Sequence, residues 1–230
     1  MPIAIVSAMH EELAAVLDLM PDESRQSAAG REFWVGHLHG REVVAVLSRI
    51  GKVAAATTAA VLVERFGVEA IVFTGVAGGL APGVQVGDVV VAERFLQHDL
   101  DASPIFPRYE VPLYGASEFR TDPALTDRLA SAVARALPAA RLHRGLVASG
   151  DRFVSTTAES RALQAALPQA LAVEMEGAAV AQVCHDFGIP FAAVRTISDR
   201  ADDQAHTDFA RFVREVASPH SAAIVQALLA

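Results

Sequence analysis

Two short acidic segments, each following an apolar run, constrain the fold of this chain more than any other feature. The first is VEMEG at residues 173–177, and the second is RTISD at residues 195–199. The apolar runs predict buried strands, and open α/β sheets form their ligand sites at the carboxyl ends of strands. Charged side chains are rarely buried without a partner. The sequence therefore predicts an α/β sheet with three carboxylates, a guanidinium and a hydroxyl gathered at one edge to hold something polar.

The rest of the chain alternates strand and helix patterns. Strands are expected at residues 2–7, 32–39, 42–48, 70–74, 86–96, 144–149, 171–173 and 189–197, with a hairpin across Gly40. Helices are expected at residues 9–20, 51–66, 123–136, 156–167, 177–187 and from Asp208 onward, where Pro219 should kink or split the helix. Asp122, Thr156 and Gly67 have the residue types of helix caps, and residues 97–119 are expected to form a loop.

This order predicts a single α/β domain over residues 1–230, because no repeat, linker or low-complexity segment interrupts it. The expected architecture has three layers, a mixed twisted central sheet flanked by helices. A chain of 230 residues that is 52% hydrophobic can bury a sizeable core without a second domain.

Charge and cysteine content exclude several classes of partner. The chain has 27 acidic and 19 basic residues, a net charge of −8, and no cluster of basic residues that would follow phosphates, so nucleic acid is not an expected partner. No apolar run is long enough to cross a bilayer, so no membrane association is expected. The single cysteine, Cys184, excludes an internal disulfide, and the N-terminus lacks the features of a signal peptide. We therefore expect a cytoplasmic protein.

The acidic segments also have simpler interpretations. Glu176 has the charge that suits a helix N-terminus, and Asp199 has the residue type of an N-cap. Arg195 would be accounted for if it neutralised one of the glutamates.

Other reactive residue types carry weaker signals. His98 with Asp99 and Asp101 suggests a metal site, but no further ligand has a recognisable spacing, so a hydrogen-bonded histidine is the preferred interpretation and no metal is expected. Cys184 lies among apolar neighbours in a predicted helix, which favours a buried structural thiol. Three serines could be considered as nucleophiles, but none of them lies in a nucleophile-elbow pattern: Ser7, Ser149 and Ser155.

Six segments together resemble the 5'-methylthioadenosine/S-adenosylhomocysteine nucleosidase family. In chain order they are Ala8-Met9 with Glu12, GKVAA at 51–55, TGVAGGL at 74–80, SGDRF at 149–153, VEMEGA at 173–178 and Ser198-Asp199. The resemblance covers nearly the whole chain, whereas the glycine-rich segment alone would be weak evidence, because it lacks the Gly-Lys-Ser/Thr ending of a phosphate loop.

The resemblance implies a nucleoside phosphorylase/hydrolase-like fold and a methionine-salvage activity. The family cleaves the N-glycosidic bond of 5'-methylthioadenosine and S-adenosylhomocysteine to adenine and a thioribose, and 5'-deoxyadenosine is a further expected substrate. The resemblance also implies a homodimer, and no cofactor is expected to be needed.

The resemblance also implies catalytic roles. An adenine leaving group needs an acid, and the ribose needs a water on its opposite face. Asp199 would protonate adenine, Glu12 would be the base that positions the water, and Glu174 with Arg195 would fix that water or the surrounding charge.

Substrate contacts are implied in the same way. Glu176 would accept hydrogen bonds from the ribose hydroxyls, Met9 and Met175 would pack on the sugar, Phe153 would stack on adenine, and the backbone of Val154 would read its edge. Ordinary core packing is the alternative for Met9, Met175 and Phe153. Further implied substrate-binding residues are Ile50, Val76, Ala77, Gly78, Ser198 and Phe209. Val76 stands where some relatives have serine, so a hydroxyl contact is absent there.

A loop of the partner subunit closes the 5'-substituent pocket in the family, and Ile105, Phe106 and Pro107 correspond to it here.

Three rival functions remain open at this point. A purine nucleoside phosphorylase would use phosphate in place of water, although the acids at residues 11 and 12 should repel phosphate. A 6-amino-6-deoxyfutalosine hydrolase would differ only around the 5'-substituent. A non-catalytic nucleoside-binding protein would be expected to lack one of the three acids Glu12, Glu174 and Asp199.

Overall fold

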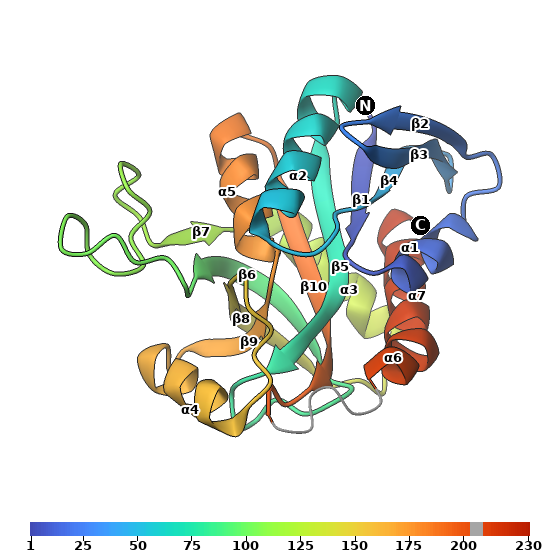
Figure 1. Ribbon diagram of the computed structural model, residues 1–230. Coiled ribbons are helices and arrows are strands. Elements are labelled where there is room, and N and C mark those ends of the chain that lie inside the picture. Colours follow the sequence, from blue (N-terminus) through green and yellow to red (C-terminus); the bar gives the residue numbers. More distant parts are fainter. Residues whose placement is uncertain (203–208) are drawn as a thin grey trace.

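The strands pair into one mixed sheet of ten strands in the computed structural model, which describes residues 1–202 and 209–230 (Figure 1). The strands are β1 (Ile3–Ser7), β2 (Ser24–Ala28), β3 (Arg31–Leu38), β4 (Arg41–Leu47), β5 (Ala70–Gly79), β6 (Val89–Gln97), β7 (Glu118–Arg120), β8 (Leu142–Ser149), β9 (Ala170–Glu174) and β10 (Phe191–Asp199). Their order is β10-β6-β8-β9-β5-β1-β4-β3-β2, with β7 beside β6. Because β10 also pairs with β5, the strands β5, β10, β6, β8 and β9 close into a ring.

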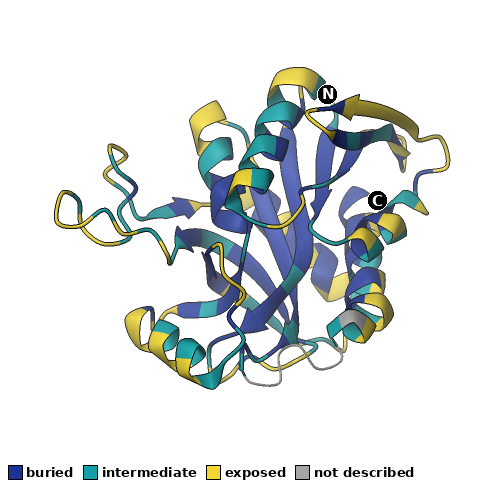
Figure 2. Cartoon of the chain, viewed as in Figure 1, coloured by how far each residue is buried: buried dark blue, intermediate teal, exposed yellow. Residues whose placement is uncertain are grey.

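Helices cover both faces of this sheet (Figure 1). They are α1 (His10–Leu17), α2 (Lys52–Phe66), α3 (Pro123–Ala136), α4 (Thr157–Ala166), α5 (Gly177–Phe187), α6 (Phe209–Phe212), the π-helical turn η1 (Val213–Ala217) and α7 (Ser218–Leu229). Alternate residues of β1 point to opposite faces, so Ala4 and Val6 pack in the cluster with α2 and α5, and Ile3 and Ile5 in the cluster with α1, α3 and α7. The central strands are buried on both sides, whereas β2 and α4 are largely exposed (Figure 2). None of the described helices has the length and apolar character needed to span a membrane.

The predicted helix boundaries marked by capping residues are confirmed. The Asp122 carboxylate accepts a hydrogen bond from the backbone N–H of Leu125 at 2.7 Å, and the Thr156 hydroxyl accepts one from Glu159 at 3.2 Å. Gly67 ends α2 in the left-handed conformation, with φ of 59°. These contacts are local, which explains why the sequence pattern was sufficient.

The expected end of the fourth strand at Thr74 is wrong, because β5 continues through the glycine-rich segment to Gly79. Residues Gly75–Gly78 pair with β10, and Gly78 and Gly79 pair with β9. Non-local pairing on both edges therefore overrides the local preference of glycine for loops.

Three further differences concern the ends and edges of the fold. The polar edge strand β2 was not expected. Within the predicted loop, β6 extends to Gln97, and β7 forms at Glu118–Arg120. The C-terminal stretch is split as predicted, but Pro219 lies in the first turn of α7, where its missing N–H is tolerated, and a π-helical turn precedes it. The predicted helix start at Asp208 lies outside the described residues.

Candidate active site

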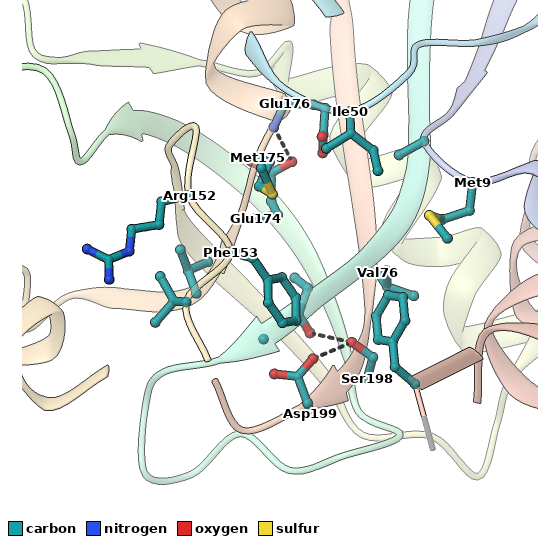
Figure 3. Close-up of a pocket in the computed structure, with 16 residues that line it drawn as sticks. Met9, Ile50, Val76, Arg152, Phe153, Glu174, Met175, Glu176, Ser198 and Asp199 are labelled. Carbon is teal, nitrogen blue, oxygen red and sulfur yellow. Dashed lines mark hydrogen bonds between the residues drawn. The ribbon is translucent and has the colours of Figure 1, made fainter. Parts of the chain in front are cut away.

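A cavity of about 340 Å³ lies where β5, β9 and β10 end (Figure 3). All eleven substrate-binding residues implied by the resemblance line it: Met9, Ile50, Val76, Ala77, Gly78, Phe153, Val154, Met175, Glu176, Ser198 and Phe209. Two of the predicted catalytic residues, Glu174 and Asp199, also line it, whereas Glu12 and Arg195 are buried behind its lining. Ala8, Arg152 and Val173 complete the lining; they lie in the segments that carry the resemblance, but no role was predicted for them. The Arg152 side chain points away from the cavity and pairs with Glu159.

The carboxyl end of β10 presents Asp199 at one end of the cavity (Figure 3). Its Oδ1 accepts a hydrogen bond from the N–H of Ala201 at 2.7 Å, and its Oδ2 accepts one from the Ser198 hydroxyl at 2.7 Å. Burial raises the pKa of Asp199 above its ordinary value. A Cβ at Gly78 would lie 2.9 Å from Asp199 Oδ1, so only glycine lets β5 pass this close. Asp199 is thus a partly satisfied carboxyl with a raised proton affinity at the cavity wall.

Glu174, at the end of β9, is a fully satisfied carboxylate. Its Oε2 pairs with Nη2 of Arg195 at 2.8 Å, and the N–H groups of Glu176 and Gly177 donate to it. The Ser149 hydroxyl donates to Oε1 and accepts from the N–H of Ala178. The interpretation that Arg195 neutralises a glutamate is therefore confirmed.

Arg195 is itself held in a fixed position. It is only 1% exposed, Nη1 donates to the carbonyl of Phe73 at 3.2 Å, and its guanidinium lies 4.1 Å from the centre of the Phe73 ring. The Glu174–Arg195 pair is a fixed charged unit, with Glu174 in the lining of the cavity and Arg195 buried behind it.

Glu12, in the first turn of α1, contrasts with Glu174. It is fully buried, and its Oε2 accepts one hydrogen bond, from the N–H of Met9 at 3.2 Å. Its Oε1 accepts none from the described part of the chain. Burial raises the pKa of Glu12 to about 7, and the charge of Arg195 offsets part of that effect. A buried carboxyl with a free oxygen and a pKa near neutrality has the properties of a general base.

Glu176 lies at the other end of the cavity from Asp199, beside Met175 and Ile50 (Figure 3). It occupies the N-cap position of α5, but its side chain makes no capping hydrogen bond there. Instead its Oε1 accepts from the N–H of Gly51 at 2.9 Å. Burial and the neighbouring charge of Glu174 raise the pKa of Glu176 to about 7. The helix-terminus interpretation therefore does not account for its side chain.

The other candidate residues lie outside the cavity. Ile105, Phe106 and Pro107 do not line it, and Ile105 is 82% exposed. No group of three or more ligands placed to hold a metal ion, whether at His98, Asp99 and Asp101 or elsewhere, occurs among the described residues. The preferred interpretation of His98 as a hydrogen-bonded histidine is wrong for its ring Nε2, which is buried without a partner in that part of the chain. Cys184 is buried, which raises the pKa of its thiol and fits the structural interpretation.

Comparison with known proteins identifies the fold and the class of enzyme. The model of the phosphorylase superfamily matches residues 2–230. The chain belongs to the phosphorylase superfamily. The 5'-methylthioadenosine/S-adenosylhomocysteine nucleosidase of Neisseria meningitidis, in complex with methylthio-immucillin-A, is 34% identical, with a TM-score of 0.93 over 99% of this chain and 97% of that chain. The corresponding nucleosidase of S. pneumoniae, with a transition-state inhibitor, is 35% identical, with a TM-score of 0.92 over 100% and 98%.

A third solved structure has a similar sequence identity and TM-score. The futalosine hydrolase of Helicobacter pylori is 35% identical, with a TM-score of 0.91 over 99% of this chain and 96% of that chain. The predicted three-layer nucleoside phosphorylase/hydrolase fold is therefore confirmed, and this chain is a nucleosidase, an enzyme that hydrolyses N-glycosidic bonds.

Two supporting contacts escaped the sequence analysis. Ser149 was considered only as a nucleophile, but its hydroxyl joins Glu174 to the start of α5. The N–H of Gly51 meets Glu176 across 125 residues of sequence. Neither contact has a local signal, since each depends on which strands and turns become neighbours in the sheet.

Proposed function

We propose that this nucleosidase hydrolyses 5'-methylthioadenosine and S-adenosylhomocysteine to adenine and the 5-substituted ribose, and that it also accepts 5'-deoxyadenosine. The observation that carries the proposal is the pair of acid–base groups at one cavity: Asp199 in its wall, and Glu12 buried behind Met9 with one oxygen free of partners among the described residues. Similarity to 5'-methylthioadenosine/S-adenosylhomocysteine nucleosidases supports the same assignment.

Asp199 acts on the leaving group. A protonated carboxyl beside adenine donates to N7 and accepts from the 6-amino group, which selects 6-amino over 6-oxo purines. The raised pKa of Asp199 favours the protonated form that this step needs. The Ser198 hydroxyl, 2.7 Å from Oδ2, orients the carboxyl. Phe153, which is 46% exposed at the cavity, stacks on the base.

Glu12 acts on the water. As the glycosidic bond breaks, the ribose gains oxocarbenium character and a water attacks C1' from the face opposite adenine. Glu12 accepts the proton of this water through its free oxygen. Glu174 is already saturated by Arg195, Ser149 and two backbone N–H groups, so it acts with Arg195 as a fixed ion pair beside the developing cation and is not the base.

Glu176 binds the ribose. One of its carboxylate oxygens is held by Gly51, which leaves the other to accept from the 2'- and 3'-hydroxyls. We expect Glu176→Ala to lose discrimination between ribosyl and 2'-deoxyribosyl substrates. Unchanged discrimination, measured as the ratio of kcat/KM for the two, would remove this role.

A 6-amino-6-deoxyfutalosine substrate is the second candidate, favoured by the similarity to a futalosine hydrolase. It shares the base and ribose contacts and differs only at the 5'-substituent. A phosphorylase reaction is disfavoured by charge: Glu12, Glu174 and Glu176 surround the ribose end, and the guanidinium of Arg195 is committed to Glu174.

The active form is proposed to be a cytoplasmic homodimer, as the resemblance to the family implies. Ile105 and Leu113, which are 82% and 92% exposed on the loop beside β7, are apolar enough to pack on a second subunit. Ile105, Phe106 and Pro107 would then close the partner's 5'-substituent pocket. Sedimentation analysis of the wild type and of Ile105→Asp tests this, with a shift toward monomer expected for the variant.

Adenine release from 5'-methylthioadenosine, with and without phosphate, tests the proposed reaction. Free methylthioribose without phosphate is the expected product. Methylthioribose 1-phosphate with a phosphate requirement would make the enzyme a phosphorylase. Release of adenine only from 6-amino-6-deoxyfutalosine would select the second candidate.

A further inference from the structure

We propose that Lys52, Asp99 and Asp151 form a positioning cluster that holds the N–H of Gly51 against Glu176 and so sets the ribose-binding carboxylate in place. The inference rests on the proposed role of Glu176. None of the three cluster residues lines the cavity, so they act through Gly51 and not on the substrate.

The cluster is a closed loop of hydrogen bonds between three segments distant in sequence. Lys52 Nζ donates to Asp99 at 2.6 Å and to Gln97 at 3.0 Å. The other oxygen of Asp99 accepts from the backbone N–H of Asp151 at 2.8 Å, and Asp151 Oδ1 accepts from the backbone N–H of Lys52 at 2.7 Å. Asp151 therefore fixes the backbone of Lys52, and Asp99 fixes its ammonium group.

The position of Gly51 follows directly from these bonds. Gly51 precedes Lys52 at the N-cap of α2, with φ of 96°, and a Cβ there would lie 3.1 Å from Asp151 Oδ1. Its own N–H donates to Glu176 at 2.9 Å. Asp151 thus fixes the backbone of Lys52, and the N–H of the preceding residue, Gly51, reaches the ribose end of the cavity.

Charge keeps the cluster assembled. Burial acts to raise the pKa of Asp99, but the hydrogen bonds from Lys52 and from the backbone of Asp151 outweigh it and hold that pKa below its ordinary value. Lys52 is only 16% exposed, so its charge is partly shielded from solvent. The ion pair between Lys52 and Asp99 therefore helps to hold the cluster together.

The same cluster reaches the base end of the cavity. Asp151 is followed directly by Arg152, Phe153 and Val154, all of which line the cavity. Gln97, the second acceptor of Lys52, also bonds Gln182 of α5, the helix that starts beside Glu176. The cluster therefore connects the turn at Gly51, at the ribose end of the cavity, with residues 152–154 at its base end.

The first test measures Glu176 without any substrate. The charged groups that act on Glu176 are Glu174 from β9, which raises its pKa, and Arg195 from β10, which lowers it; the N–H groups of Gly51 and Met175 also lower it. Loss of the Gly51 hydrogen bond should therefore raise the pKa of Glu176, by about 0.5 to 1.

Carboxyl ¹³C NMR titration of the full chain measures this, with the Glu176 signal assigned by its absence in Glu176→Gln. We expect the midpoint to rise in Asp151→Ala and to return toward the wild-type value in Asp151→Asn, whose amide oxygen still accepts from Lys52. Asp22→Ala is the matched control, because Asp22 is also exposed and accepts a backbone N–H, from His37 at 2.8 Å, at the far hairpin. An unchanged midpoint in Asp151→Ala, or an equal rise in the control, would overturn the proposal.

The second test is a double-mutant cycle on turnover. Asp151→Ala should lower kcat/KM for the ribosyl substrate about tenfold relative to wild type, which is the factor expected for one hydrogen bond. Adding the same substitution to Glu176→Ala should lower kcat/KM by less than about twofold relative to Glu176→Ala alone. Additive losses would show that Asp151 does not act through Glu176. If the wild type releases no adenine, the proposed function fails, whereas the titration still decides whether the cluster positions Glu176.

Discussion

The two buried glutamates at the cavity, Glu174 in its lining and Glu12 behind it, have the same side chain and opposite surroundings. Glu174 has a guanidinium, a hydroxyl and two backbone N–H groups around it, whereas Glu12 has one backbone N–H and one oxygen with no partner among residues 1–202 and 209–230. Burial alone therefore does not define an acid–base group. The number of donors around the carboxylate decides whether it serves as fixed charge or as a proton acceptor.

Asp199 is intermediate between the two glutamates and gives the largest expected effect. It has two hydrogen bonds, and burial raises its pKa, which favours the protonated form that can donate to adenine. We expect Asp199→Asn to lower kcat by about 10³-fold or more, toward the upper part of the usual contribution of general acid catalysis, because adenine is a poor leaving group. Stopped-flow or coupled detection of adenine measures this. A loss below tenfold would show that leaving-group protonation does not depend on Asp199.

Removing the charge of Glu174 from its ion pair with Arg195 tests whether Glu174 is a structural charge. Glu174→Gln leaves Arg195 buried without a counter-charge and should lower the free energy of unfolding by about 3–5 kcal/mol. The control is Glu93→Gln, which removes a half-exposed ion pair with Arg144 and should cost less than about 1 kcal/mol. Urea unfolding of both variants at pH 7 measures the difference, and equal losses would contradict the assignment of Glu174 as structural charge.

Removing the charge of Glu12 is expected to raise the free energy of unfolding at high pH, whereas removing the charge of Glu174 lowers it. The folded-state pKa of Glu12, about 7, lies above the ordinary value of 4.5, so ionisation is harder in the folded state, and its contribution to stability is lost as pH rises from about 4.5 through 7. Glu12→Gln removes this loss. Its free energy of unfolding relative to wild type should therefore be more favourable at pH 8 than at pH 4, by up to about 3 kcal/mol.

Unfolding curves at the two pH values for wild type, Glu12→Gln and the exposed control Glu64→Gln provide the measurement. Using the difference between two pH values cancels the cost of burying the Gln amide itself. A relative stability of Glu12→Gln that is the same at both pH values would show that Glu12 titrates normally in the folded protein.

The sequence predicted local features of the fold well and non-local ones poorly. The caps at Asp122 and Thr156 and the hairpin across Gly40 depend on neighbouring residues, and all are present. The extension of β5 to Gly79 depends on pairing with β10 and β9, so local glycine preference gave the wrong end.

The site shows the same division. The residues that line the cavity followed from the resemblance, because they occupy short motifs at strand ends. What distinguishes Glu12 from Glu174 did not follow, since the donors to Glu174 come from Ser149 on β8 and Arg195 on β10. Nor does any motif predict that Oε1 of Glu12 would lack a partner among the described residues.

The turnover of Glu12→Gln at saturating 5'-methylthioadenosine tests the central claim most directly. Substrate should still bind, as equilibrium binding of the nucleoside would show, because the cavity lining is unchanged and Glu12 does not contribute to it. The account predicts that adenine release falls by about 10²-fold or more, the contribution of a general base. Release within a few-fold of the wild-type rate would contradict the account and would leave the water to be activated by another group.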